Sequence, residues 1–236
     1  MDAPDNSGPY LSVVFPCLDE IQAVRQCIED ASKVITELGV TGEVILCNNG
    51  SSDGSDRAAK EMGAIVIDEP SIGYGTACRS GLKAAQGEIL VLLDCDGSYH
   101  LSDVSRLIKP IQLGNADVVL GSRFLGEMLA GSMPLLNRRL GNPLLTKAAE
   151  YVSKVRTTDG QSGMKALSRH AYEELRFSSS GPEFTHEFLV QIGGQGARTV
   201  EVSVRYYPRI GRTKLKRWRA ALRHLRFLAG TIFSRL

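Results

Sequence analysis

Short apolar runs alternate with longer segments whose apolar residues recur at helical spacing, and this alternation extends over most of the chain. The runs predict buried strands and the longer segments predict amphipathic helices. The expected strands are Leu11 to Phe15, Val44 to Cys47, Ala64 to Ile67, Ile89 to Leu93, Asp117 to Leu120, Met164 to Leu167 and Val200 to Val204. The expected helices are Asp19 to about Leu38, a short one after Ser55, Gly75 to Ala85, Ser102 (as N-cap) to Leu113, Arg138 to Val152, Phe184 to Ile192 and about Lys214 to Leu228. Strands and helices in this order predict an α/β fold, a mostly parallel sheet flanked by helices.

The apolar run Ile89 to Leu93 ends abruptly on two carboxylates, Asp94 and Asp96. Ligands collect outside the carboxyl ends of strands in open α/β sheets, so this pair is expected at the mouth of a site. Adjacent carboxylates repel each other and gain from a hard cation, which favours Mg²⁺ or Mn²⁺. The alternative is an ordinary solvated turn, because Asp and Gly are common turn residues.

Length and composition favour one domain over residues 1–236, since 236 residues with 43% apolar content suffice for one sizeable core. The segment Met1 to Pro9 is polar and acidic, unlike a signal peptide, and no apolar run approaches the length of a membrane span. The five cysteines are odd in number and lack the spacing of a zinc or redox motif, which predicts reduced thiols in a cytoplasmic protein.

The C-terminal part of the chain is strongly basic. After Glu201 there is no acidic residue but there are ten basic ones, which predicts an anionic partner or surface. A basic amphipathic helix is expected over about 214–229, and it could hold the protein on the inner face of an anionic membrane. The alternative is a helix packed on its own domain with a solvated basic face. Its apolar stripe consists of Leu215, Trp218, Leu222, Leu225, Ala229 and Ile232.

Two other turn-rich segments have more than one interpretation. Gly73 and Gly75 follow a strand as in a dinucleotide fingerprint, but Cys78 occupies the third glycine position, which disfavours a Rossmann dehydrogenase. These glycines fit a tight turn equally well. Asn48, Asn49 and Asp53 suit contacts with a base or ribose, or Asx turns.

Five motifs occur in a fixed order along the chain: Val13 to Glu20, Asn48 to Gly54, Gly73 to Gly75, Asp94 to Ser98 and Gly121 to Phe124. In that order they resemble family 2 glycosyltransferases of the GT-A fold, and among these the dolichyl- or polyprenyl-phosphate sugar synthases. The later segments Met133 to Pro143, Ser162 to Ala166 and Glu183 to Glu187 are similar to the same subgroup. The resemblance extends from about Val13 to Phe227.

The resemblance implies a metal-dependent, inverting transfer of a hexose from a UDP- or GDP-sugar to a polyprenyl phosphate, with no nucleic-acid partner. It implies a cation on Asp94 and Asp96, with Ser98 a weaker third ligand. The implied donor-binding residues are Pro16, Leu18, Glu20, Asn49, Asp53, Gly75, Arg79, Asp94, Cys95 and Asp96. The acceptor candidates are Arg123, Arg138, Arg139, Arg212 and Lys214, and the catalytic candidates are Asp96, Arg123, Glu183 and Glu187.

The acceptor stays open between two classes. A phosphate monoester is already anionic near neutral pH and needs no general base. A small hydroxyl acceptor needs one, for which Glu183, His186 and Glu187 are the obvious cluster, although the two glutamates also fit as ordinary helix charges. A non-catalytic nucleotide- or membrane-binding module is disfavoured by the Asp94 and Asp96 pair. A sugar nucleotidyltransferase is disfavoured because the loop after Phe15 lacks glycine and arginine.

Overall fold

The protein is described from a computed structural model, which places residues 8–212 and 217–233. The strands are β1 (Leu11–Cys17), β2 (Gly42–Asn48), β3 (Ile65–Asp68), β4 (Ile89–Leu92), β5 (Val118–Ser122), β6 (Lys165–Ser168) and β7 (Thr199–Ser203). The α-helices are α1 (Val24–Leu38), α2 (Ser55–Glu61), α3 (Tyr74–Ala84), α4 (Val104–Gln112), α5 (Asn142–Ser153), α6 (Arg169–Glu173), α7 (Phe184–Gly194) and α8 (Arg217–Phe233). A 3₁₀ turn, η1 (Leu101–Asp103), precedes α4, and a π-helical turn, η2 (Asn137–Gly141), precedes α5.

All seven strands form one sheet in the order β3-β2-β1-β4-β6-β5-β7. Every pair is parallel except the two that β6 makes with β4 and β5. The mostly parallel α/β sheet expected from the pattern is therefore confirmed. The antiparallel β6 brings the segment before it, with Gly163, beside the carboxyl end of β4.

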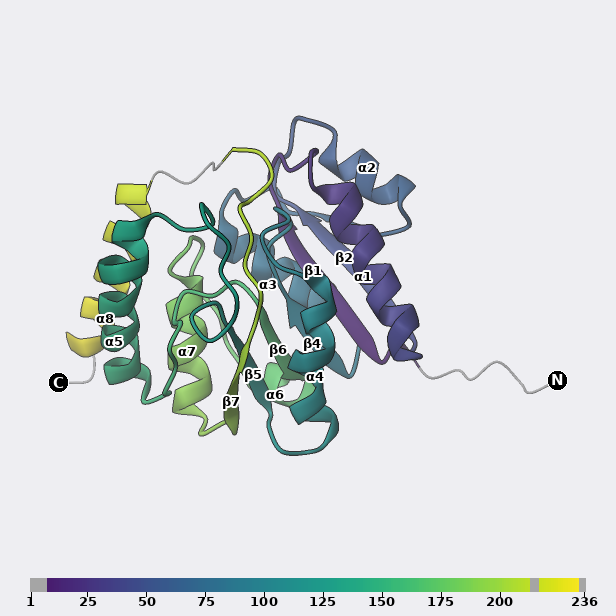
Figure 1. The fold of residues 1–236 in the computed structure, drawn as a ribbon. Coiled ribbons are helices and arrows are strands. Elements are labelled where there is room, and N and C mark those ends of the chain that lie inside the picture. The colour runs from purple at the N-terminus through teal and green to yellow at the C-terminus, as the bar shows by residue number, and fades with distance from the viewer. Residues whose placement is uncertain (1–7, 213–216, 234–236) are drawn as a thin grey trace.

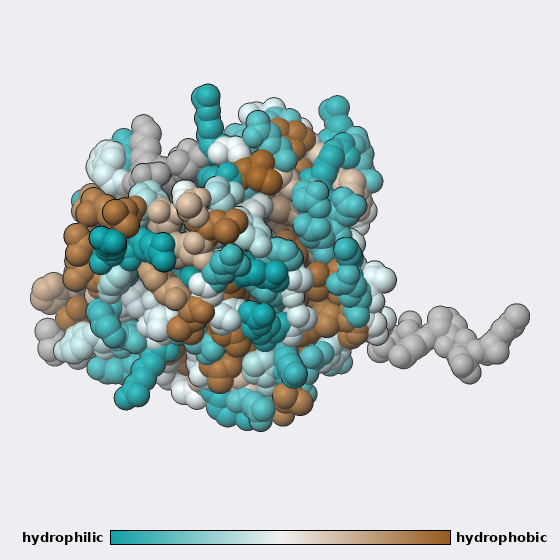
Figure 2. Space-filling model, viewed as in Figure 1, coloured by the Kyte–Doolittle hydropathy of each residue, from teal (hydrophilic) through white to brown (hydrophobic). Residues whose placement is uncertain are grey.

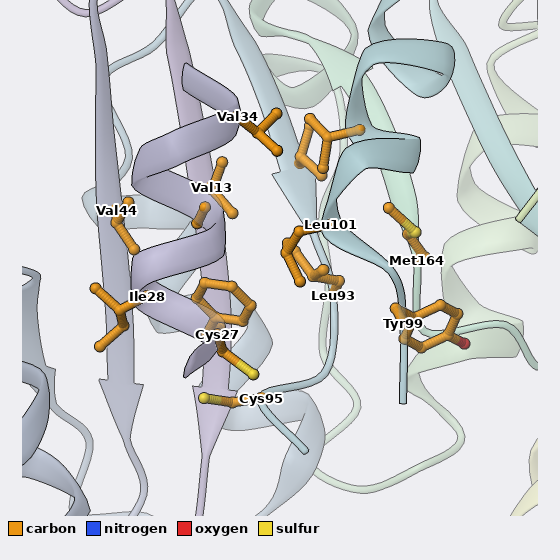
Figure 3. Close-up of a cluster of buried hydrophobic side chains, with 14 of the residues drawn as sticks. Val13, Cys27, Ile28, Val34, Val44, Leu93, Cys95, Tyr99, Leu101 and Met164 are labelled. Atoms are coloured by element: carbon orange, nitrogen blue, oxygen red, sulfur yellow. The ribbon is translucent and has the colours of Figure 1, made fainter. Parts of the chain in front are cut away.

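Helices cover both faces of the sheet (Figure 1). One face packs against α1 and α4 around a core that includes Val13, Ile28 and Leu107. Figure 3 shows part of this core, including Ile28 and Val34 of α1 and Val13 and Val44 of the neighbouring strands. The other face packs against α3, α5 and α7, with Leu228 of α8 joining that core. All five cysteines are free and buried, as expected for reduced thiols.

The first helix begins later than the sequence pattern predicted. It starts at Val24, after a turn in which the Glu20 carbonyl accepts from the Ala23 and Val24 amides, because Asp19 and Ile21 bind the loop after β2. Asp19 has a positive φ of 53°, and its carboxylate accepts a hydrogen bond from the Ser52 amide at 2.7 Å. The Ile21 amide donates to the Asp53 carboxylate at 3.0 Å. The two loops therefore stabilise each other at the carboxyl edge of the sheet.

The prediction of Ser102 as an N-cap was also wrong. Its side chain caps no helix, since its hydroxyl pairs with His100 Nδ1 at 2.8 Å and accepts from Arg205 at 2.5 Å. Arg205 also binds the buried Asp103 through two nitrogens, which ties the segment after β7 to the start of α4. The short helix α6 was not expected from the pattern.

The segment after β7 is hydrogen-bonded to the loop that follows β4. The Tyr207 amide donates to the Ser98 carbonyl and the Ile210 amide to the Asp96 carbonyl, both at 2.8 Å. Gly97 has a φ of +72°, and a Cβ there would lie 2.7 Å from the Ile210 side chain, so this close approach requires glycine. The contact fixes Arg209 beside the carboxylates at the strand end.

Helix α8 lies beside α5 at the edge of the molecule opposite α1 and α2 (Figure 1). Across residues 8–212 and 217–233, the helices lack the length and apolar character that crossing a bilayer requires.

Candidate active site

A cavity of about 640 Å³ opens at the carboxyl ends of β1, β4 and β5. Its position follows from the parallel topology, because the loops after those strands meet at one edge. The candidate site residues that line it are Pro16, Leu18, Glu20, Asn49, Asp94, Cys95, Asp96 and Arg123. The structure thus brings together residues from all five sequence motifs, and the third motif, Gly73 to Gly75, contributes Gly73 and Tyr74.

Asp94 is held rigidly at the cavity wall. Its Oδ1 accepts a hydrogen bond from the Tyr74 hydroxyl at 3.0 Å, and a Cβ on Gly163 would lie only 2.3 Å from its Oδ2. Burial, and after it the charge of Asp96, raises the pKa of Asp94 to about 6. The half-buried carboxylate therefore gains from any cation that enters the cavity.

Asp96 faces an arginine that the sequence motifs did not indicate. Arg209 Nη1 lies 3.5 Å from Asp96 Oδ2, and Arg209 Nη2 bonds Glu20 Oε1 at 2.5 Å. Asp96 Oδ1 accepts from the Ser98 amide at 3.0 Å, which closes the turn after β4. The polar side of the cavity therefore combines three carboxylates with one arginine from a distant part of the chain.

The carboxylate pair fits a hard divalent cation. Asp94 and Asp96 both line the cavity, and Asp94 is destabilised in its charged form. In the described part of the chain, no group of three or more His, Cys, Asp or Glu side chains is placed to hold a metal. Two carboxylates with the remaining positions left to water and phosphate oxygens match the way Mg²⁺ is usually bound. Ser98 Oγ is buried without a partner among the described residues, yet it does not line the cavity.

Arg123 is anchored by a buried ion pair. Its Nε and Nη2 bind the two oxygens of Asp159 at 2.6 and 2.7 Å, and its guanidinium carbon lies 5.0 Å from the centre of the Tyr206 ring. Arg123 is 8% exposed and lines the cavity. Asp159 uses one edge of the guanidinium, so the edge that carries Nη1 is directed away from it. The arrangement holds a cation in a fixed orientation.

Lys165 is a second buried cation close to Asp94. Lys165, the first residue of β6, donates to the Ser162 carbonyl and is 3% exposed. Burial lowers the pKa of Lys165 to about 8, and the charge of Asp94 opposes that shift. Its proximity to Asp94 depends on the antiparallel insertion of β6.

The glutamates considered as general bases lie outside the cavity lining. Glu187 accepts from the amides of Ser178 and Ser179 at 2.7 and 2.9 Å. Glu183 binds Arg223 through both oxygens, at 2.7 Å from Nε and 2.5 Å from Nη2. Burial would raise the pKa of Glu183, but the Arg223 hydrogen bonds outweigh it and hold the pKa below its usual value. Both side chains are therefore held by hydrogen bonds outside the cavity lining, and their catalytic role stays a prediction.

Further candidate residues also lie away from the cavity. Asp53 caps the turn before α2, and Arg79 donates to the Phe177 carbonyl at 3.2 Å. The Gly75 amide bonds the Ser180 carbonyl, and a Cβ there would meet the Ser179 carbonyl at 2.4 Å, so this glycine serves close packing. The other candidates outside the lining are Ser98, Arg138, Arg139 and Arg212, and Lys214 lies outside the described residues.

The two asparagines after β2 organise the neighbouring loop. Asn49 Nδ2 donates to the Glu69 and Ser71 carbonyls, both at 3.0 Å, and its Oδ1 accepts from the Gly73 amide. Asn48 bonds Asp68 and closes its own turn onto Ser51. The turn interpretation holds for Asn48, whereas Asn49 binds the loop of residues 69–73 and reaches the cavity wall.

The sequence motifs missed several residues of the site. Arg209 belongs to the acid-free C-terminal part, so its charge was visible but its place was not. His224 of α8 lines the cavity, with its ring centre 4.6 Å from that of the buried His186. Burial lowers the pKa of His186 to about 3 and that of His224 to about 4, so both are neutral at pH 7. Asp159 belongs to none of the sequence motifs, so nothing in the sequence indicated its pairing with Arg123.

The family model described as "Glycosyl transferase family 2" matches residues 12–176. The low-salt glycan biosynthesis hexosyltransferase of Haloferax volcanii is 35% identical over 99% of this chain, which spans 57% of that relative's length. The dolichyl-phosphate hexose transferase of the same organism is 30% identical over 87% of this chain and 86% of its own length.

Among solved structures, glucosyl-3-phosphoglycerate synthase from Mycobacterium tuberculosis superposes with a TM-score of 0.73 at 24% identity, over 97% of this chain and 80% of that one. That crystal structure contains Mn²⁺, uridine diphosphate and glucosyl-3-phosphoglycerate. The likeness confirms the expected GT-A fold.

Proposed function

Because the chain belongs to glycosyl transferase family 2, we propose that it moves a hexose from a UDP- or GDP-sugar to a polyprenyl phosphate, with inversion at the anomeric carbon. The observation that carries this proposal is that Asp94, Asp96 and the buried Arg123 line one cavity. Such a cavity offers a cation site and an anion site close together. The relative named dolichyl-phosphate hexose transferase supports the acceptor class.

The donor occupies the strand-end side of the cavity in this proposal. Pro16, Leu18, Glu20, Asn49 and Cys95 surround the nucleoside end, and Asp94 and Asp96 hold Mg²⁺ or Mn²⁺. When bound, the metal stabilises the negative charge that develops on the leaving diphosphate. Arg209, already beside Asp96 and Glu20, adds a second positive charge at that position.

The acceptor oxygen is the nucleophile. A phosphate oxygen forms a bond to the anomeric carbon as the bond to the nucleoside diphosphate breaks, and the electron pair leaves with the diphosphate. A phosphate monoester needs no base, because it is already ionised near neutral pH. The engagement of Glu183 and Glu187 in structural hydrogen bonds therefore favours a phosphate acceptor over a hydroxyl. Arg123 is the group proposed to bind the acceptor phosphate.

A second candidate is transfer to the hydroxyl of a small soluble compound. It is supported by the structural likeness to an enzyme crystallised with glucosyl-3-phosphoglycerate, whose product carries a phosphate on a small acceptor. His224 is the titratable cavity group on the α8 side, but a pKa of about 4 makes it a weak base at pH 7.

An acceptor assay tests the proposal. The full chain is incubated with a panel of radiolabelled UDP- and GDP-hexoses, Mg²⁺ or Mn²⁺, and undecaprenyl phosphate in detergent. We expect label in the lipid fraction with one donor. Label only on added 3-phosphoglycerate would favour the second candidate, and binding of the donor without transfer to any acceptor would contradict an enzymatic function.

Metal affinity should depend on pH around the pKa of Asp94. Since that pKa is about 6 in the free protein, Asp94 carries a proton below pH 6, and the proton must leave before a cation binds. We expect the affinity for Mn²⁺ to fall by about tenfold between pH 7 and pH 5, and to change little above pH 7. Calorimetric titration at pH 5, 6 and 7 measures this. Equal affinity at pH 5 and pH 7 would contradict the assignment of Asp94.

A further inference from the structure

One wall of the cavity differs chemically from the strand-end side. It is built by the segment before η2, η2, α5, the start of α7 and α8. Most of its lining residues are apolar or small, and the polar ones are Ser132, Asn137, Asn142, Thr185 and His224. The apolar or small ones include Met133, Pro134, Leu145, Pro182, Ala220 and Ala221. Helices α5 and α8 pack against each other, so this wall is continuous from one helix to the next. The cavity therefore connects a polar side, with Arg123 and the carboxylates, to an apolar side.

Helix α8 is fixed in place where it borders the cavity. Arg223 binds Glu183 and also Ser180, with Nη2 3.0 Å from the Ser180 hydroxyl. His224 is the next residue and Leu228 lies one turn beyond it; they are 7% and 3% exposed and pack on the same side of the helix. Ala220 lies one turn before His224, so the alanines occur where the anchored face reaches the cavity. Their small side chains leave that space open.

The outer surfaces of the same two helices carry exposed apolar side chains. Leu136 and Leu144 of the η2–α5 segment are 69% and 68% exposed, and Trp218 of α8 is 65% exposed. Figure 2 shows apolar side chains gathered at the α5 and α8 edge of the molecule. Large exposed apolar patches on soluble domains commonly mark sites of interaction. The other exposed apolar residues here are Leu135, Leu140, Leu222 and Leu225.

We propose that the first isoprene units of the acceptor lie along the wall of Leu145, Ala220 and Ala221, and that the chain leaves the protein between η2 and the start of α8. The inference rests on the proposed function, because it takes a polyprenyl phosphate as the occupant. Charge complementarity sets the direction: the phosphate end meets the cavity arginine Arg123, and the apolar tail follows the apolar wall outward. Exposed arginines beside the exit suit a lipid surface with anionic headgroups. They are Arg138, Arg139, Arg219 and Arg226.

Ala221→Trp tests this path. Ala221 is exposed on one side and lines the cavity on the other, so an indole can be accommodated without overpacking the core. We expect kcat/KM for undecaprenyl phosphate to fall by roughly tenfold or more, which corresponds to about 1.4 kcal/mol. For dimethylallyl phosphate, a soluble acceptor with one isoprene unit, the loss should be several times smaller, and donor affinity should be unchanged. Ala229→Trp, on the exposed part of the same helix, should change neither acceptor.

The outcomes separate the path from the function on which it rests. If the unmodified protein uses no polyprenyl phosphate, both proposals fail. If it does and Ala221→Trp alters both acceptors equally, or neither, only the path fails. Ala221→Leu, a smaller change, should show the same selectivity to a lesser degree and covers the case in which the tryptophan variant does not fold. Self-association through the exposed leucines, with unchanged lipid acceptor kinetics in both variants, would also overturn the path.

Discussion

Asp96→Asn is expected to lower glycosyl transfer by at least about a hundredfold while leaving the fold intact. Asparagine keeps the shape of the side chain, and its Oδ1 can still accept the hydrogen bond from the Ser98 amide at 3.0 Å that closes the turn. The substitution removes one of the two carboxylate charges of the proposed cation site. It also removes the partner of Arg209 Nη1, which lies 3.5 Å from Asp96 Oδ2. Charge stabilisation at the diphosphate is therefore lost without loss of packing.

Two measurements make this prediction specific. Titration with Mn²⁺ should show weakened binding in Asp96→Asn, and thermal unfolding in the absence of metal should be nearly unchanged. Asp30→Asn is the matched control, because Asp30 accepts a hydrogen bond from Gln26 on α1 and lies outside the cavity lining. Wild-type turnover of Asp96→Asn in excess chelator would remove the metal from the mechanism.

The parts of the site that follow single strands were predictable from the sequence. Each strand is a local apolar run, and parallel topology brings the residues after it to one edge. Asp94 and Asp96 were found this way, because they directly follow the apolar run Ile89 to Leu93, and the family resemblance added Pro16 and Asn49 at the ends of the neighbouring strands. The mostly parallel sheet was predictable for the same reason.

The parts that depend on contacts between distant segments were not predictable. Arg209 reaches Glu20 across 189 residues, and Arg223 reaches Glu183 across 40. No local pattern encodes such pairs, so Arg209 was missed, and so was the ion pair of Glu183 with Arg223. The π-helical turn is a third case, since its register directs Asn137 and Gly141 toward the cavity and leaves Arg138 exposed.

Arg123→Ala is expected to destabilise the protein strongly as well as to abolish use of a lipid phosphate. The guanidinium and the Asp159 carboxylate form a buried pair, with side chains 9% and 0% exposed. Removing one partner leaves a buried charge uncompensated, which typically costs about 3–5 kcal/mol of unfolding free energy. Loss of activity in this variant alone would therefore not distinguish acceptor binding from misfolding.

The double variant Arg123→Gln with Asp159→Asn resolves the ambiguity. It removes both charges and keeps side chains that can hydrogen-bond, so we expect it to recover most of the stability lost in the single variant. Urea unfolding of the wild type, Arg123→Gln, Asp159→Asn and the double variant measures the coupling free energy between the two side chains. Arg198→Ala, which breaks the exposed Arg198–Asp117 pair, is the control and should cost far less.

The same double variant then isolates the role of Arg123 in the reaction. With the fold recovered, binding of the nucleotide sugar should be close to that of the wild type, since the carboxylates and the nucleoside end are untouched. Transfer to undecaprenyl phosphate should remain at least about a hundredfold below wild type, because no fixed guanidinium remains to bind the phosphate. If the double variant regains both stability and lipid-phosphate transfer, Arg123 serves only the fold, and the acceptor phosphate is bound by another cation such as Arg209.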